Sequence, residues 1–103
     1  MNTPALRPAE LESIVSVLRR HPEVTEARLF GSRAKGNHRP ESDVDLALWG
    51  DVDDLAAQAI AAELDELPLP YHYDVRPFGL IRLQALREHI ERVGIPILKA
   101  TRT

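Results

Sequence analysis

Apolar positions along the chain follow two different spacings, which predict helices and strands in turn. Steps of three and four residues predict helices over Pro8–Arg20, Asp54–Leu67 and Leu80–Val93. Short apolar runs predict strands over Val24–Phe30, Asp43–Trp49, Tyr71–Phe78 and Ile95–Leu98; the last contains Pro96 and so suits a sheet edge. The polar stretch Gly31–Ser42 is predicted to be a functional loop with one helical turn. This order of elements predicts an α/β fold with helices packed on a small sheet.

The spacing also predicts which side of each helix faces the core. In the second helix, the residues expected to share the buried face are Leu55, Ala59, Ala62 and Leu67. In the third helix they are Leu80, Leu83, Leu86, Ile90 and Val93. Asp51 or Asp53 is expected to cap the start of the second helix, because an aspartate accepts hydrogen bonds from the first free amides.

Composition narrows the classes of protein that this chain can be. Its 103 residues, 44% of them apolar, predict a single domain over residues 1–103. The absence of cysteine excludes disulfides, thiolate zinc sites and a thiol nucleophile. A net charge of −3 argues against direct binding to nucleic acid, which needs a basic face. No apolar run suits a membrane helix and the first residues do not resemble a signal peptide, so we expect a cytoplasmic protein without membrane contact.

Two aspartates at the start of the second predicted strand are the first candidate for chemistry. Side chains of a strand alternate between faces, so Asp43 and Asp45 are expected to point the same way, while Val44, Leu46 and Leu48 point into the core. Two carboxylates on one face repel each other unless a cation lies between them. Ligand sets of oxygen alone select hard ions, so the pair suits Mg²⁺ or Mn²⁺.

Asp74 is the candidate for a third carboxylate. It lies in the middle of an aromatic and β-branched strand, where aspartate is unfavourable. If that strand lies beside the strand of Asp43 and Asp45, the three acids form one cluster. Two metal ions bridged by such a cluster are a common arrangement for displacement at phosphorus.

The loop that precedes these acids has the features of a phosphate site. Gly31 opens the turn after a strand, so a triphosphate can approach the backbone without meeting a β-carbon. Ser32 offers a hydroxyl where the next amides point outward. Lys35 and Arg39 add positive charge. The loop is therefore expected to hold phosphates opposite a carboxylate cluster.

The pattern Gly31-Ser32, ten residues, then Asp43-x-Asp45, with a later aspartate on another strand, resembles the DNA polymerase beta-like nucleotidyltransferase superfamily. More narrowly, the segment from Leu29 to Gly36 together with Asp45-Leu46 resembles the minimal nucleotidyltransferases (MNT), antitoxins usually paired with HEPN toxins. The resemblance implies that superfamily's fold, a small mixed sheet with helices packed on it. It covers nearly the whole chain.

The resemblance also implies roles for the residues. Gly31 and Ser32 would hold the triphosphate, Asp43 and Asp45 would bind two Mg²⁺ ions, and Asp74 would be the third ligand and the base. The donor would be ATP and the acceptor a tyrosine of a HEPN toxin, which the transfer of AMP silences. Lys35 stands where many relatives have arginine. Lysine keeps the positive charge but lacks the planar guanidinium, so the resemblance supports a phosphate role for Lys35 less strongly.

Two other functions fit the sequence. The chain could be an antitoxin that only masks a toxin surface, or a nucleotidyltransferase that acts on a small molecule or RNA. The intact acids favour catalysis, and the short chain leaves no room for an acceptor-binding domain, which favours a protein acceptor. The role of Arg33 stays open between phosphate binding and structural pairing with a carboxylate. His72 shares a face with Asp74 and could border the site, whereas His21 ends the first helix.

Overall fold

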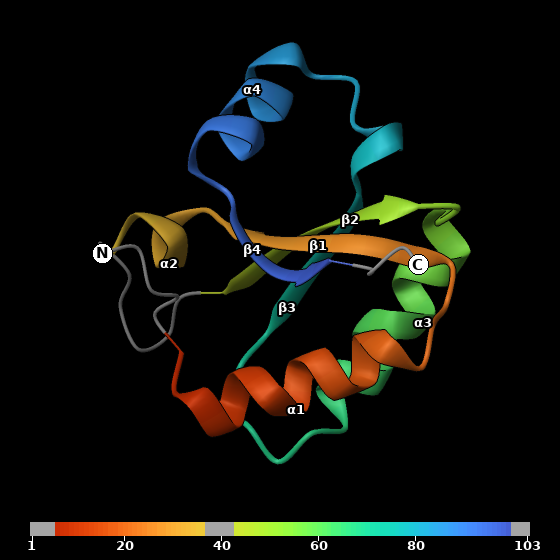
Figure 1. Cartoon of the computed structure of the whole chain (residues 1–103), viewed down its shortest axis with the longest axis vertical. Helices are drawn as coiled ribbons and strands as arrows, with labels where there is room; N and C mark the ends of the chain where they lie inside the picture. The colour runs from red at the N-terminus through yellow and green to blue at the C-terminus, as the bar shows by residue number, and fades with distance from the viewer. Residues whose placement is uncertain (1–5, 37–42, 100–103) are drawn as a thin grey trace.

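The computed structural model describes residues 6–36 and 43–99, and shows a four-stranded sheet between two layers of helices (Figure 1). The helices are α1 (Pro8–Arg19), α2 (Ser32–Lys35), α3 (Asp54–Asp65) and α4 (Gln84–Val93), with a short 3-10 turn, η1 (Phe78–Leu80), before α4. The strands are β1 (Val24–Phe30), β2 (Val44–Gly50), β3 (Tyr73–Pro77) and β4 (Ile95–Lys99). The predicted order of elements and the single helical turn in the loop are confirmed.

The sheet is mixed, with the order β3-β2-β1-β4. β1 pairs antiparallel with β2 and with β4, whereas β2 and β3 run parallel. A parallel neighbour needs a crossover, and α3 provides it between β2 and β3. β4, with Pro96, lies at an edge as predicted, and β3 lies at the other edge.

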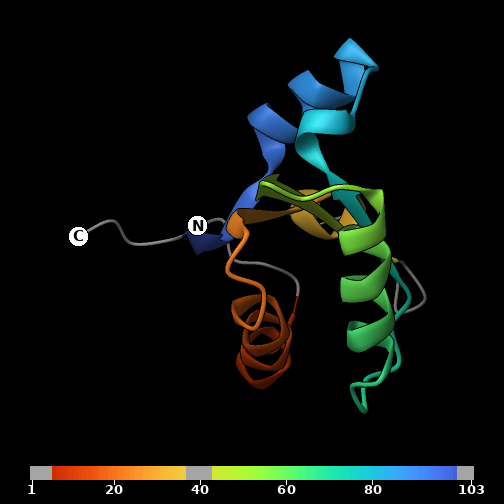
Figure 2. The same ribbon diagram turned by 90° about the vertical axis from the view of Figure 1, so that its right-hand side faces the viewer.

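Helices α1 and α3 lie side by side against one face of the sheet, and α4 lies against the other (Figure 2). Alternation along β2 sends Val44, Leu46 and Leu48 toward α1 and α3, where each is at most 1% exposed. Burying such a side chain stabilises the fold by roughly 1.5–3 kcal/mol. A smaller cluster under α4 contains Phe30, Ala47, Phe78 and Ile90.

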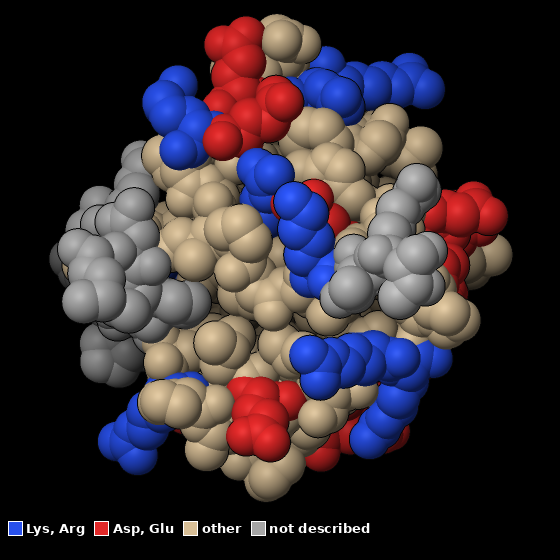
Figure 3. Space-filling model, in the orientation of Figure 1, with Lys and Arg blue, Asp and Glu red and all other residues tan. Residues whose placement is uncertain are grey.

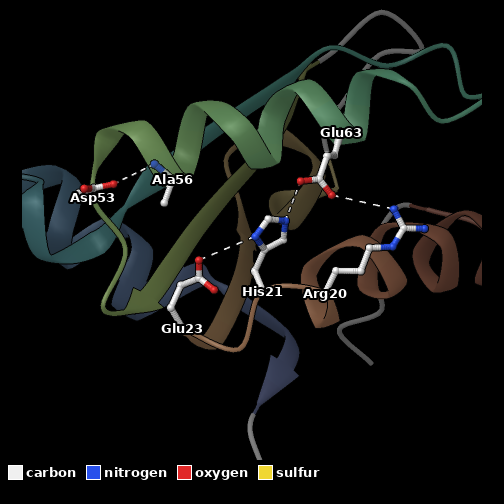
Figure 4. A network of polar contacts seen from close by, with 6 residues as sticks. All are labelled: Arg20, His21, Glu23, Asp53, Ala56 and Glu63. Carbon is white, nitrogen blue, oxygen red and sulfur yellow. Dashed lines mark hydrogen bonds and ion pairs between the residues drawn. The ribbon is translucent and has the colours of Figure 1, made fainter.

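A polar contact ties the end of α1 to α3 (Figure 4). His21, just after α1, contacts Glu63 of α3 through Nε2 and Oε2 at 2.8 Å, and its Nδ1 lies 3.8 Å from Glu23. Asp53 caps the other end of α3 by accepting a hydrogen bond from the Ala56 amide at 2.8 Å. Of the two predicted caps, Asp53 is therefore the one that the structure contains.

The predicted core face of α3 is wrong. Its buried residues are Ala57, Ile60 and Leu64, whereas Leu55 is 75% exposed. The helix is so rich in alanine that several faces have apolar spacing, and the bulky Ile60 and Leu64 decide which one packs. The predicted start of α4 is also too early, since Leu80 lies in η1, Leu83 precedes α4, and both are exposed.

On the face shown in Figure 3, acidic and basic side chains are interspersed. No continuous basic patch is visible among the described residues on this face. Within residues 6–36 and 43–99, no helix is long and apolar enough to cross a membrane.

Candidate active site

Asp45 and Asp74 lie at the same level of two neighbouring strands. Their Cα atoms are register partners across the parallel pair β2–β3, and strands in such sheets are about 4.8 Å apart. Asp45 alternates with the core residues Val44 and Leu46, so it lies on the face that α4 covers in part. The two strands are neighbours, which meets the condition on which the role of Asp74 depends.

Asp43 immediately precedes β2 and is exposed. The predicted strand begins one residue too early, so alternation alone does not fix the direction of this side chain. Its negative charge nevertheless acts on Asp45.

The surroundings of Asp45 oppose its ionisation. Burial, the negative charge of Asp74 and then that of Asp43 raise the pKa of Asp45 to about 6, and the positive charge of Arg76 acts in the opposite direction. The raised pKa of Asp45 thus reflects its own burial and the negative charges of Asp74 and Asp43 near it. A cation bound there would relieve this repulsion.

Asp74 has a basic neighbour two residues along the same edge strand. Arg76 Nε donates a hydrogen bond to Asp74 Oδ2 at 3.2 Å, and both side chains are partly exposed. Among the described residues, no three histidine, cysteine, aspartate or glutamate side chains already stand close enough together to hold a metal ion. Asp45 and Asp74 are therefore neighbours in strand register, and their charges interact. The Asp74 side chain, however, points to Arg76.

Gly31 lies directly against Asp45. It follows Phe30, the register partner of Asp45 in the β1–β2 pair, and has φ +77°. A β-carbon at this position would overlap Asp45 Oδ2. Glycine is therefore favoured here by the backbone conformation, and any larger residue would have to displace the Asp45 carboxylate. The sequence suggests only the approach of a phosphate.

The other predicted phosphate residues follow Gly31. Ser32 and Lys35 begin and end α2, but their side chains lie outside what the structure describes, and Arg39 falls in residues 37–42, which it does not describe. His72 is exposed just before β3. The structure thus brings together Gly31, Asp45 and Asp74 as its described centre.

Arg33, whose role the sequence leaves open, is buried with 3% exposure. Its guanidinium carbon lies 4.6 Å from the centre of the Tyr71 ring. Tyr71 is not among the site residues that the sequence predicts, because nothing in the local pattern links it to a loop 38 positions earlier. A buried arginine close to the phosphate loop is a feature that only the tertiary structure reveals.

A mixed sheet with a glycine turn packed against an acid of the neighbouring strand is the arrangement expected of a nucleotidyltransferase. The sequence profile of "Polymerase beta, Nucleotidyltransferase" matches residues 12–103. Among curated proteins, no significant match was found. The solved structure of a minimal nucleotidyltransferase is 31% identical, with a TM-score of 0.67, and the match covers 85% of this chain and 89% of that one. The chain therefore belongs to the polymerase beta nucleotidyltransferase family, among its minimal nucleotidyltransferases.

Two further solved structures share the fold at lower identity. One, a toxin–antitoxin complex with AMP-PNP, is 24% identical with a TM-score of 0.73, and the match covers 88% of this chain and 74% of that one. The other is the MNT antitoxin bound to the tri-AMPylated HEPN toxin of Shewanella oneidensis, 19% identical with a TM-score of 0.71, covering 92% of this chain and 74% of that one.

Proposed function

We propose that this nucleotidyltransferase transfers AMP from ATP to a tyrosine of a HEPN toxin, and so acts as the antitoxin. The observation that carries the proposal is the register of Asp45 and Asp74, with the Asp45 carboxylate packed against the glycine turn that the sequence assigns to phosphates. The AMPylated HEPN toxin seen with a structurally similar MNT antitoxin supports the choice of a HEPN toxin as the acceptor. The toxin–antitoxin complex with AMP-PNP supports the choice of ATP as the donor. With ATP as donor, we place the reaction in the cytoplasm.

We assign Mg²⁺, two ions, or alternatively Mn²⁺, to the acids. The donor set fits, because Asp43, Asp45 and Asp74 offer carboxylate oxygens alone, and burial together with the charges of Asp74 and Asp43 raises the pKa of Asp45. When bound, the ions neutralise the phosphates and the leaving pyrophosphate. Asp74 would have to leave Arg76 to join them, since the two side chains are hydrogen-bonded.

The chain's own residues have separable tasks in this proposal. Gly31 and Ser32 hold the triphosphate, and Lys35 and Arg39 add positive charge to it. Asp74 accepts the proton of the acceptor hydroxyl. The hydroxyl oxygen bonds to the α-phosphorus while the bond to pyrophosphate breaks, so the acceptor gains AMP and pyrophosphate leaves. A carboxylate suits this proton transfer because it can accept a proton from a hydroxyl held within hydrogen-bond distance.

Co-expression with a HEPN toxin tests the function. The partner to use is the all-helical protein with an Arg-x-x-x-x-x-His motif, if one is encoded beside this chain. Intact-mass measurement should show adenylyl groups on the toxin, and peptide mapping should place them on tyrosine. Asp45→Asn is the matched inactive control. A toxin that is neutralised without modification by wild type and by Asp45→Asn alike would identify a masking antitoxin instead.

A further inference from the structure

Helix α2 is too short to hold its own position. It has four residues, and the first turn of a helix fixes several dihedral angles in exchange for one hydrogen bond. It directly follows Gly31, so its placement sets the direction in which the turn presents its amides. That placement has to come from contacts with the rest of the fold.

Arg33 is the residue of α2 that reaches the interior. Among the described residues it is the one charged or polar side chain that is buried with the core. An arginine stays charged in a protein, so burying it is costly unless other groups compensate. The face of Tyr71, 4.6 Å from the guanidinium carbon, provides part of that compensation as a cation–π contact.

Tyr71 is itself held from two sides. Its hydroxyl donates a hydrogen bond to Glu10 Oε1 at 2.9 Å, and its ring meets Tyr73 edge to face at 6.5 Å between centroids. Glu10 Oε1 also accepts a hydrogen bond from the Arg7 amide at 3.0 Å, which fixes it at the start of α1. Tyr71 is therefore a rigid platform that joins α1 to the segment entering β3.

Tyr71 is close to one of the acids along the chain, because it lies three residues before Asp74. The stack of Arg33 on Tyr71 thus connects the turn at Gly31 with the strand that carries Asp74. On the proposed function, these are the two sides of one nucleotide site. The contact is one link between α2 and the segment that enters β3.

We propose that Arg33 is a positioning residue for the nucleotide: stacked on Tyr71, it holds α2 and the Gly31 turn in the orientation that receives the triphosphate. This inference rests on the proposed function and adds a role that acts through the loop. Arg33 and Tyr71 then work as one unit, so removing either should weaken nucleotide binding to the same extent.

The test is calorimetric titration of the full chain with AMP-PNP and Mg²⁺. We expect Arg33→Met and Tyr71→Leu each to weaken binding about tenfold, the loss equivalent to one partly buried cation–π contact. The double variant should bind no more weakly than either single variant, because both remove the same contact. Tyr71→Phe keeps the ring and should stay within about threefold of wild type. Arg20→Met is the matched control, since Arg20 is an exposed arginine beside Glu63.

Each result separates the alternatives. Wild-type affinity in Arg33→Met overturns the inference. Loss in Arg33→Met with none in Tyr71→Leu also overturns it, because Arg33 would then act on the nucleotide without Tyr71. If Arg33→Met does not fold, the comparison of Tyr71→Phe with Tyr71→Leu decides, and equal affinities overturn the inference. Absence of binding by wild type itself overturns the proposed function.

Discussion

Gly31 and Asp45 share a space that has no room for a β-carbon: one built on the glycine would overlap Asp45 Oδ2. The turn after β1 and the acid of β2 are therefore packed against each other, and a change in either is transmitted to the other. A substitution at Gly31 thus acts on the carboxylate of Asp45 as well as on the turn.

Gly31→Ala should displace Asp45 and abolish Mg²⁺-ATP binding, and it should also destabilise the fold. Gly36→Ala is a matched control, because Gly36 has a similar φ of +83° but a β-carbon there would meet no atom of the described residues within 4 Å. Both variants incur about 1–2 kcal/mol for a left-handed alanine. Only Gly31→Ala adds the overlap of the new β-carbon with Asp45 Oδ2. Thermal unfolding and calorimetry with ATP measure the two effects, and equal losses of binding would contradict the role of the contact.

Asp45→Asn should stabilise the protein at neutral pH in the presence of EDTA. The raised pKa of Asp45, about 6, means that the folded state holds this proton more tightly than the unfolded chain does. The stability that this proton binding contributes is present below the unfolded pKa near 4 and is lost as the pH rises through about 6. Solvent screening limits the effect to about 1 kcal/mol.

Urea unfolding of wild type and Asp45→Asn, from below about pH 4 to above about pH 7, measures this difference. Other carboxylates titrate in both proteins, so the difference between them isolates Asp45. The free energy of unfolding of Asp45→Asn minus that of wild type should increase as the pH rises. Parallel profiles would show that the carboxylate is better solvated than its surroundings indicate.

Asp74→Asn should lower the rate of AMP transfer by about 10²-fold or more, the usual scale for the loss of a general base. Its affinity for ATP should fall less than that of Asp43→Asn, because the proposed base acts on the acceptor as well as on a metal. Quenched-flow measurement of toxin modification and calorimetry separate rate from affinity. If Asp74→Asn and Asp43→Asn lowered the transfer rate and the ATP affinity equally, Asp74 would be a metal ligand and not the general base.

His21→Ala should destabilise the fold by about 1 kcal/mol without changing ATP affinity. It removes the 2.8 Å contact with Glu63 that joins α1 to α3, and a typical internal hydrogen bond contributes this much. Glu66→Gln is the control, at the exposed C-cap of the same helix. Chemical unfolding compares the two. A loss of ATP binding in His21→Ala would reveal coupling between the helices and the site.

The parts of the site that the sequence can predict are those that local spacing determines. Alternation around Asp45 and the turn at Gly31 are both short-range features. The partnership of Asp45 with Asp74 depends on which strands are neighbours, and the sequence can state it only as a condition. The stack of Arg33 on Tyr71 cannot be predicted, because both residues fit ordinary local patterns and meet only in the folded chain.

The sequence predicts the fold well where each element has one apolar face and less well where it does not. In β2, Val44, Leu46 and Leu48 alternate along one face, and the predicted start of the strand is within one residue of the observed one. In α3, alanines make several faces equally apolar, so the spacing assigns Leu55 to the core although it faces solvent. Helix ends also differ, because Leu83 fits the helical spacing but precedes α4.

Because α3 lies between β2 and β3 in the sequence, Asp45 and Asp74 can pair only after most of the chain has been synthesised. The hairpin of β1 and β2 emerges from the ribosome first and already contains Gly31 and Asp45, whereas Asp74 follows only after α3. A shift of β3 by a single residue would place Tyr73 or Val75 opposite Asp45 and turn Asp74 to the other face of the sheet. A nascent or misaligned chain therefore has only part of the site, and only the completed domain has both acids in register.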